Sequence, residues 1–138
     1  MQDLIFRLLI DPPRTTAQEK GVAFINGRPH FYEKSSVKEA RKMLKAALSK
    51  HKPEKPFSGA IEVVTVWCYD HKGRHKDYEA KTTKPDVDNM VKLMLDVMTG
   101  DFWEDDRQIV KLTVMKRWNR RGEIYVGIQP AKEVENNV

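Results

Sequence analysis

Carboxylates are concentrated in one segment of an otherwise basic chain, residues 84–108, KPDVDNMVKLMLDVMTGDFWEDDRQ. Its aspartates stand at positions 86, 88, 96, 101, 105 and 106. Stretches rich in lysine and arginine flank it, at 72–84 and 116–121. Mg²⁺ prefers carboxylate and water oxygens, and a DNA backbone must be held by cations around it. Two acid clusters, 86–88 and 104–106, framed by basic residues therefore indicate a magnesium site for phosphodiester chemistry.

The first acid cluster opens a predicted helix over 86–99. Asp86 takes the cap position and Gly100 follows the last residue. At about 100° per residue, the apolar side chains cover more than half of the circumference. The polar residues form a narrow stripe, composed of Asp88, Asn89, Lys92, Asp96 and Thr99. We expect a mostly buried helix whose polar stripe lines a cleft.

Each acid of this helix also has an ordinary structural explanation. Asp86 is a normal N-cap, and Asp88 is favoured in a first turn by the helix dipole. Asp88 and Lys92 are spaced as an i,i+4 pair. Taken singly, each residue is better explained in this way. This explanation does not account for the second acid cluster or for the basic flanks.

The length of the predicted helix sets a condition on the site. Asp86 and Gly100 are separated by roughly 21 Å, at a rise of about 1.5 Å per residue. The segment from Gly100 to Asp106 can span about 20 Å when it is extended. The two acid clusters can therefore meet only if this segment runs back along the helix. Otherwise the second acid must come from a partner subunit.

Composition indicates a single soluble domain over 1–130. The chain has 138 residues and a net charge of +5, which favours a polyanionic partner. A lone cysteine, Cys68, lies in an apolar run, so we expect a core residue in a reducing cytoplasm. No apolar stretch approaches the roughly 18 residues of a membrane span, and the start lacks the features of a signal peptide.

Hydrophobic patterns predict the other elements. The expected strands are 4–10 and 60–69, the second of them central, and the expected hairpins are 21–34, with a type I′ turn at Asn26-Gly27, and 108–129. We further expect an amphipathic helix over 35–50 with a serine cap, a loop over 70–84 and a disordered tail over 131–138. The lysines of the helix are slightly better explained as a solvated face than as a DNA-facing surface. His71 and His75 lack a third ligand, so we expect no metal there.

Residues 84–109 resemble the signature of RusA-type Holliday junction resolvases. That signature is Pro-Asp-x-Asp-Asn-x-x-Lys, then Asp-Ala-Leu, then a turn leading to Asp-Asp-x-Gln-Val. The matching residues are Pro85, Asp86, Asp88, Asn89, Lys92, Asp96, Asp105, Asp106, Gln108 and Ile109. Val97-Met98 stands where Ala-Leu is usual, which is a conservative departure. Weaker likeness extends over most of the chain, and TTAQEK at 15–20 resembles phage and prophage members.

The resemblance implies an α+β homodimer, with a small mixed β-sheet and two main helices, that nicks four-way DNA junctions symmetrically with Mg²⁺ or Mn²⁺. It implies that Asp86, Asp88 and Asp106 bind the metal and that Lys92 is catalytic. Asp105 is a further candidate ligand, either directly or through water, and Asn89 is expected to orient a carboxylate. DNA contacts are expected from the basic stretches, namely Lys72, Arg74, Lys76, Lys81, Lys84, Lys116, Arg117, Arg120 and Arg121.

Two other functions remain open from the residues alone. One is a less selective metal-dependent nuclease acting on branched or flap DNA, since the acids fix the reaction but not the shape of the DNA. The other is a catalytically silent DNA-binding protein whose acids only cap a helix and bind water.

Overall fold

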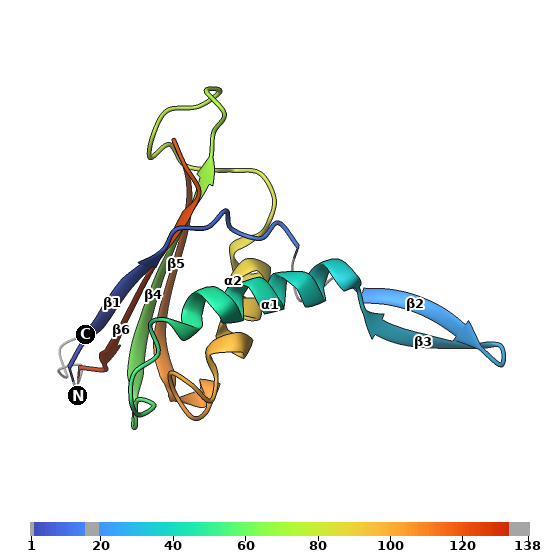
Figure 1. Cartoon of the computed structure of the whole chain (residues 1–138), viewed down its shortest axis with the longest axis horizontal. Helices are drawn as coiled ribbons and strands as arrows, with labels where there is room; N and C mark the ends of the chain where they lie inside the picture. The colour runs from blue at the N-terminus through green and yellow to red at the C-terminus, as the bar shows by residue number, and fades with distance from the viewer. Residues whose placement is uncertain (1, 16–19, 133–138) are drawn as a thin grey trace, which may run out of the picture.

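A four-stranded mixed β-sheet forms the centre of the structure, a computed structural model that describes residues 2–15 and 20–132 (Figure 1). In spatial order its strands are β1 (Leu4–Leu8), β6 (Glu123–Pro130), β4 (Ile61–Asp70) and β5 (Ile109–Asn119). β6 runs antiparallel to β1 and β4, whereas β5 runs parallel to β4. Parallel neighbours need a crossover, and α2 (Val87–Met98) supplies it. The predicted α+β fold with a mixed sheet is confirmed.

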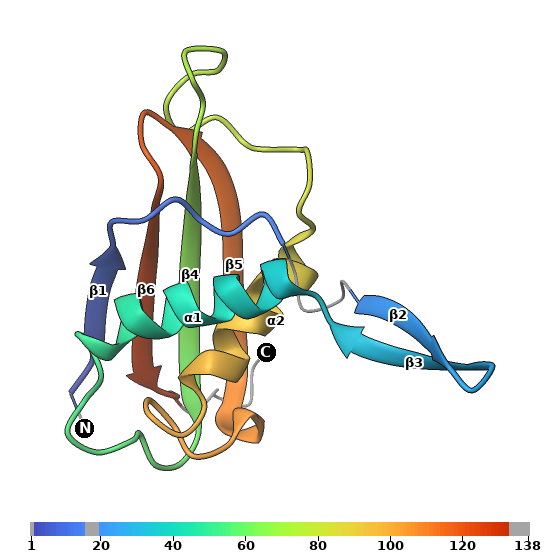
Figure 2. The ribbon, with the colours of Figure 1, turned by 45° about the vertical axis from the view of Figure 1, so that its right-hand side comes forward.

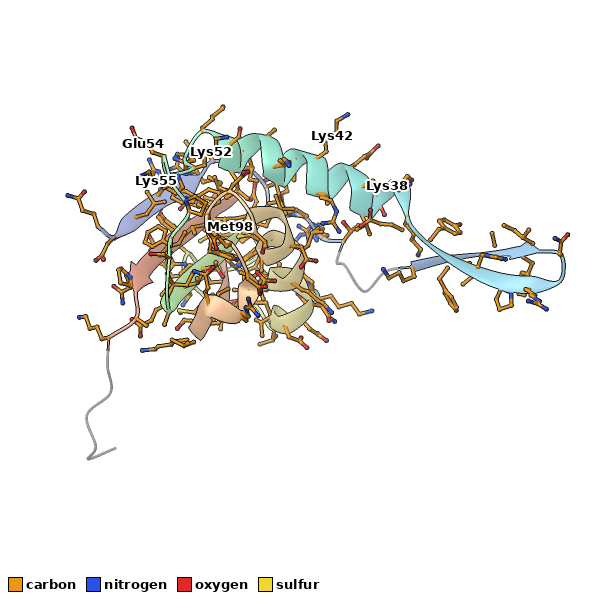
Figure 3. The ribbon with its side chains drawn as sticks, turned by 90° about the horizontal axis from the view of Figure 1, so that it is seen from below. Lys38, Lys42, Lys52, Glu54, Lys55 and Met98 are labelled. Atoms are coloured by element: carbon orange, nitrogen blue, oxygen red, sulfur yellow. The ribbon has the colours of Figure 1, made fainter. Side chains whose placement is uncertain are left out.

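Both helices, α1 (Ser35–Ser49) and α2, pack on one face of the sheet (Figure 2). Alternate strand residues point toward them, so that Val63 and Trp67 of β4 are buried against Leu44 of α1 and Met94 of α2. On α2, five of the apolar residues are buried, namely Met90, Val91, Leu93, Met94 and Met98, whereas Val87 is exposed. The predicted polar stripe is exposed or half-buried, as expected. α1 leaves its lysines exposed, and Lys42 points away from the body of the protein (Figure 3).

The opposite face of the sheet has no covering layer among the described residues. Large apolar side chains are exposed there, including Ile5 at 79%, Val64 at 42% and Met115 at 50%. Burying apolar surface of this kind between two chains would stabilise an assembly, because each Å² removed from water contributes about 25 cal/mol.

The C-terminal hairpin expected over 108–129 is wrong. β5 and β6 are consecutive in the chain, but β4 lies between them in the sheet. Both segments are strands with the expected alternation. Alternation determines which face each side chain occupies and leaves the neighbouring strand undetermined. The nearly continuous apolar run of β4 suits it to the central position between them, as predicted.

The expected hairpin at Asn26-Gly27 is confirmed. It consists of β2 (Lys20–Ile25) and β3 (Arg28–Glu33), which form a separate two-stranded sheet. Asn26 has φ 53° and Gly27 has φ 75°, the positive values that a type I′ turn requires. The hairpin extends away from the main sheet beyond the N-terminal end of α1 (Figures 1 and 2).

The helix boundaries follow the sequence closely, and the expected cap position of α2 is confirmed, whereas that of α1 differs. α1 begins at Ser35, so Lys34 is at the cap and no side chain caps the helix; the serine cap is wrong. Asp86 is at the N-cap of α2, without a side-chain cap hydrogen bond. Cys68 is buried, as expected. Most of the predicted tail, 133–138, lies outside the described residues. Within the described part of the chain, no helix is long and apolar enough to cross a membrane.

Candidate active site

Asp86 and Asp88 lie together at the N-terminal end of α2. The backbone of Asp86 is extended (φ −70°, ψ 144°), and the helix begins at the next residue. Both side chains are exposed. This end of α2 therefore presents two carboxylates to solvent.

Asp106 lies at the other end of the same helix. The Oγ1 hydroxyl of Thr99, the residue after α2, donates a hydrogen bond to Asp106 Oδ1 over 2.5 Å. The indole N–H of Trp103 donates to the same oxygen over 2.9 Å. These two bonds fix Asp106 beside the C-terminal end of α2.

The segment after α2 turns tightly and does not run back along the helix. The Gly100 N–H donates to the Trp103 carbonyl over 2.6 Å, and the Phe102 N–H donates to the Met98 carbonyl over 2.9 Å. Phe102 and Trp103 are buried, which anchors the turn in the core. The 12 residues of α2 span about 18 Å, so one chain does not bring Asp106 to Asp86.

The structure accordingly contains no ready metal cluster within one described chain. No group of three or more His, Cys, Asp or Glu side chains is arranged to hold a metal ion among residues 2–15 and 20–132. Asp86 and Asp88 are brought together, and Asp106 is separated from them. Because the segment after α2 does not run back along the helix, the alternative that is favoured is a second acid from a partner subunit.

The side chain of Asp105 caps the short turn before β5. Its carboxylate accepts from the Arg107 N–H over 2.9 Å, and Gln108 accepts from the Asp105 N–H over 2.9 Å, which makes a capping box. Gln108 Nε2 also donates to the carbonyls of Phe57 and Gly59. Sequence reasoning missed this role of Gln108, although an acid followed three residues later by glutamine is the usual signal.

Lys92 and Asn89 lie on the exposed side of α2 close to the two carboxylates. Lys92 is exposed one helical turn after Asp88, on the same stripe, and Asn89 is half-buried beside it. The ammonium group of Lys92 can therefore reach a phosphate bound near Asp88. The supporting role of Asn89 stays a prediction.

The expected DNA-contacting residues divide into three groups. Four of them are exposed in the loop before α2, namely Lys72, Arg74, Lys76 and Lys84. The arginines near the end of β5 have partners within the chain. Arg120 forms an ion pair with Asp77 at 2.6 Å and Arg121 one with Glu123 at 3.4 Å, while Arg117 donates to Cys68 Sγ. The hydrogen bond from Arg120 lowers the pKa of Asp77.

Lys81 and Lys116 differ from these residues because their ammonium groups bind backbone oxygens of the segment before Asp86. Lys81 is 4% exposed, and its Nζ donates to groups of Thr83 and Lys84. Lys116 Nζ donates to the carbonyls of Thr83 and Pro85. The structure thus places both ammonium groups against the backbone before Asp86. Their expected contact with DNA stays a prediction.

Comparisons with known proteins agree with the motif in this site. The family model described as "Endodeoxyribonuclease RusA" matches residues 12–129. The "Crossover junction endodeoxyribonuclease rusA" of Lactococcus phage r1t is 31% identical over 126 residues, which cover 89% of this chain and 95% of that protein. The "Uncharacterized protein YqaN" of Bacillus subtilis (strain 168) is 29% identical over 115 residues, which cover 75% of this chain and 81% of that protein.

Proposed function

The chain belongs to the RusA family of endodeoxyribonucleases, and on this premise we propose that it resolves four-way (Holliday) DNA junctions by paired nicks during recombination. The observation that carries the proposal is the family match over 12–129, which spans both acid clusters and Lys92. A net charge of +5 suits a polyanionic substrate.

We propose that Asp86 and Asp88 bind a divalent cation, Mg²⁺ or Mn²⁺. Their two exposed carboxylates fit such an ion, because Mg²⁺ is usually held by one or two carboxylates, several waters and the phosphates of the substrate. When bound, the ion activates a water and polarises the phosphate. The ammonium group of Lys92 then stabilises the negative charge that develops on the phosphate oxygens. Asn89 orients one of the carboxylates.

We further propose a homodimer in which each site takes the N-terminal end of α2 from one subunit and the C-terminal end of α2 from the other. A two-fold axis can bring unlike ends of two identical chains together, so Asp106 of one subunit can complete the site at Asp86 of the other. Resolution of a junction needs two opposed nicks, and a two-fold dimer supplies two sites.

A cleavage assay tests the proposed function against a less selective nuclease and against a silent DNA-binding protein. A four-way junction, a flap and a linear duplex are each incubated with the protein, with and without Mg²⁺. We expect symmetric nicks in the junction alone, and only with the metal. Equal cleavage of the flap would identify the less selective nuclease. Binding of DNA without any cleavage would identify the silent protein.

Lys92→Ala is expected to slow the chemical step without weakening binding. Loss of one charge that stabilises the transition state costs on the order of 10²–10³-fold in rate. Single-turnover cleavage at saturating protein measures the rate, and junction affinity in Ca²⁺ measures binding. Lys42→Ala, which removes an exposed lysine of α1, is the matched control and should cleave normally. A variant that loses affinity but keeps its rate would show that Lys92 binds a phosphate and takes no part in the chemical step.

Junction binding is expected to weaken steeply as salt is added. Each phosphate contact contributes roughly 0.9 to the slope of log K against log salt. Replacing Lys72, Arg74 and Lys76 together by alanine should therefore make the slope shallower by as much as about 3. Fluorescence anisotropy at several salt concentrations measures this slope. An unchanged slope would show that the loop before α2 does not contact the DNA.

A further inference from the structure

Two lysines hold three consecutive backbone carbonyls immediately before Asp86. Lys81 Nζ lies 2.5 Å from the Lys84 carbonyl oxygen, 2.6 Å from Thr83 Oγ1 and 3.4 Å from the Thr83 carbonyl oxygen. Lys116 Nζ lies 2.6 Å from the carbonyl oxygens of both Thr83 and Pro85. Every carbonyl from 83 to 85 therefore accepts a hydrogen bond from an ammonium group.

Lys81 is buried, which is uncommon for a lysine. Its Nζ lies 4.7 Å from the centre of the Trp118 ring and 5.0 Å from that of Tyr69. Burial lowers the pKa of Lys81, with smaller contributions from the charges of Lys116 and Arg14. A buried charge is costly unless its donors are satisfied, and here carbonyl and hydroxyl oxygens satisfy them. Contact with DNA would require these bonds to break.

The two lysines connect the segment before α2 to the main sheet. Lys116 belongs to β5, and the Trp118 and Tyr69 rings that contact Lys81 belong to β5 and β4. Figure 2 shows the loop after β4 leaving the end of the sheet and returning to α2. Backbone hydrogen bonds of Trp118 with Tyr78 and Glu79, and a β-bridge between Ala80 and Arg117, pair the loop with β5 as far as Ala80. Beyond Ala80, the two lysines hold the last residues before the helix.

We propose that Lys81 and Lys116 are positioning residues, which fix the backbone at 83–85 so that the Asp86 and Asp88 carboxylates face the metal and the scissile phosphate. The inference rests on the proposed function. Asp86 is the first residue beyond the held carbonyls, and Asp88 is in the first turn of the helix that follows. A misplacement of 1 Å at a reacting centre costs on the order of 10²-fold in rate, so loosening this segment should impair catalysis.

Lys81→Met and Lys116→Met test the proposal, because methionine keeps the apolar stem and removes the ammonium group. We expect single-turnover junction cleavage to slow by roughly 10–100-fold, with the half-saturating Mg²⁺ concentration raised and junction affinity in Ca²⁺ unchanged. Lys116→Arg keeps the charge and the donors and should recover most of the rate. Lys111→Met is the matched control, since Lys111 is an exposed residue of the same strand, and should behave as wild type.

Two measurements on the free protein separate positioning from other roles. Amide hydrogen exchange at 86–90 should accelerate in both methionine variants, and Mn²⁺ binding followed by water-proton relaxation should weaken, while the unfolding temperature stays near that of wild type. Unchanged exchange and Mn²⁺ binding would overturn the proposal. So would a loss of junction affinity at unchanged rate, which would make the lysines DNA contacts. If the wild type cleaves no junction, the proposed function fails, whereas exchange and Mn²⁺ binding still decide the positioning role.

Discussion

Asp88→Asn is expected to abolish junction cleavage while junction binding persists. The substitution keeps the size of the side chain and replaces a charged metal ligand by a neutral amide. Loss of one such group should slow cleavage by at least about 10²–10³-fold, the magnitude seen when one charge-stabilising contact is removed. Removing a negative charge that faces the phosphates should leave affinity equal or higher. Single-turnover cleavage and anisotropy in Ca²⁺ measure the two quantities.

Stability does not explain the loss of activity expected for this variant. Asp88 is exposed in the first turn of α2, where an acid contributes about 0.3–1 kcal/mol through the helix dipole. Thermal unfolding should therefore shift by only a few degrees. Glu39→Gln removes an exposed acid from α1 and should leave cleavage unchanged. Cleavage by Asp88→Asn at the wild-type rate would contradict a role in metal binding.

Local patterns were enough to predict most of the elements that carry the site. The apolar periodicity of α2 predicted both its burial and its polar stripe, because a helix presents side chains at a fixed angular spacing. Asn26-Gly27 predicted the β2–β3 turn, since few other dipeptides accept positive φ at both positions. The motif from Asp86 to Asp106 was sufficient to suggest the family that the comparisons confirm.

Features that depend on distant contacts were not predictable in the same way. The absence of pairing between β5 and β6, which are consecutive in the chain, depends on contacts between distant segments, which alternation alone does not encode. The tight turn at Gly100 depends on packing of Phe102 and Trp103 in the core. Lys81 looked like one basic residue among many, because the acceptors that bind it are backbone oxygens, which every sequence contains.

The separation of Asp106 from Asp86 leads to an expected result for mixed dimers. If each site takes Asp88 from one subunit and Asp106 from the other, Asp88→Asn and Asp106→Asn should each be inactive as homodimers. A heterodimer of the two variants contains one site with both substitutions and one site with neither. We therefore expect the heterodimer, which has one intact site where the wild-type dimer has two, to nick one strand of the junction.

The two chains are coexpressed with different tags, so that only heterodimers survive sequential purification. Strand-specific labelling should then reveal nicked junctions that are not resolved into two duplexes, since resolution needs both sites. As a control for the tags, a dimer of two Asp106→Asn chains, each with a different tag, should remain inactive. If both acids act within one chain, every site of the mixed dimer has one defect, and the absence of nicking would overturn the shared site. A mass near 16 kDa by light scattering, with cleavage intact, would exclude the dimer itself.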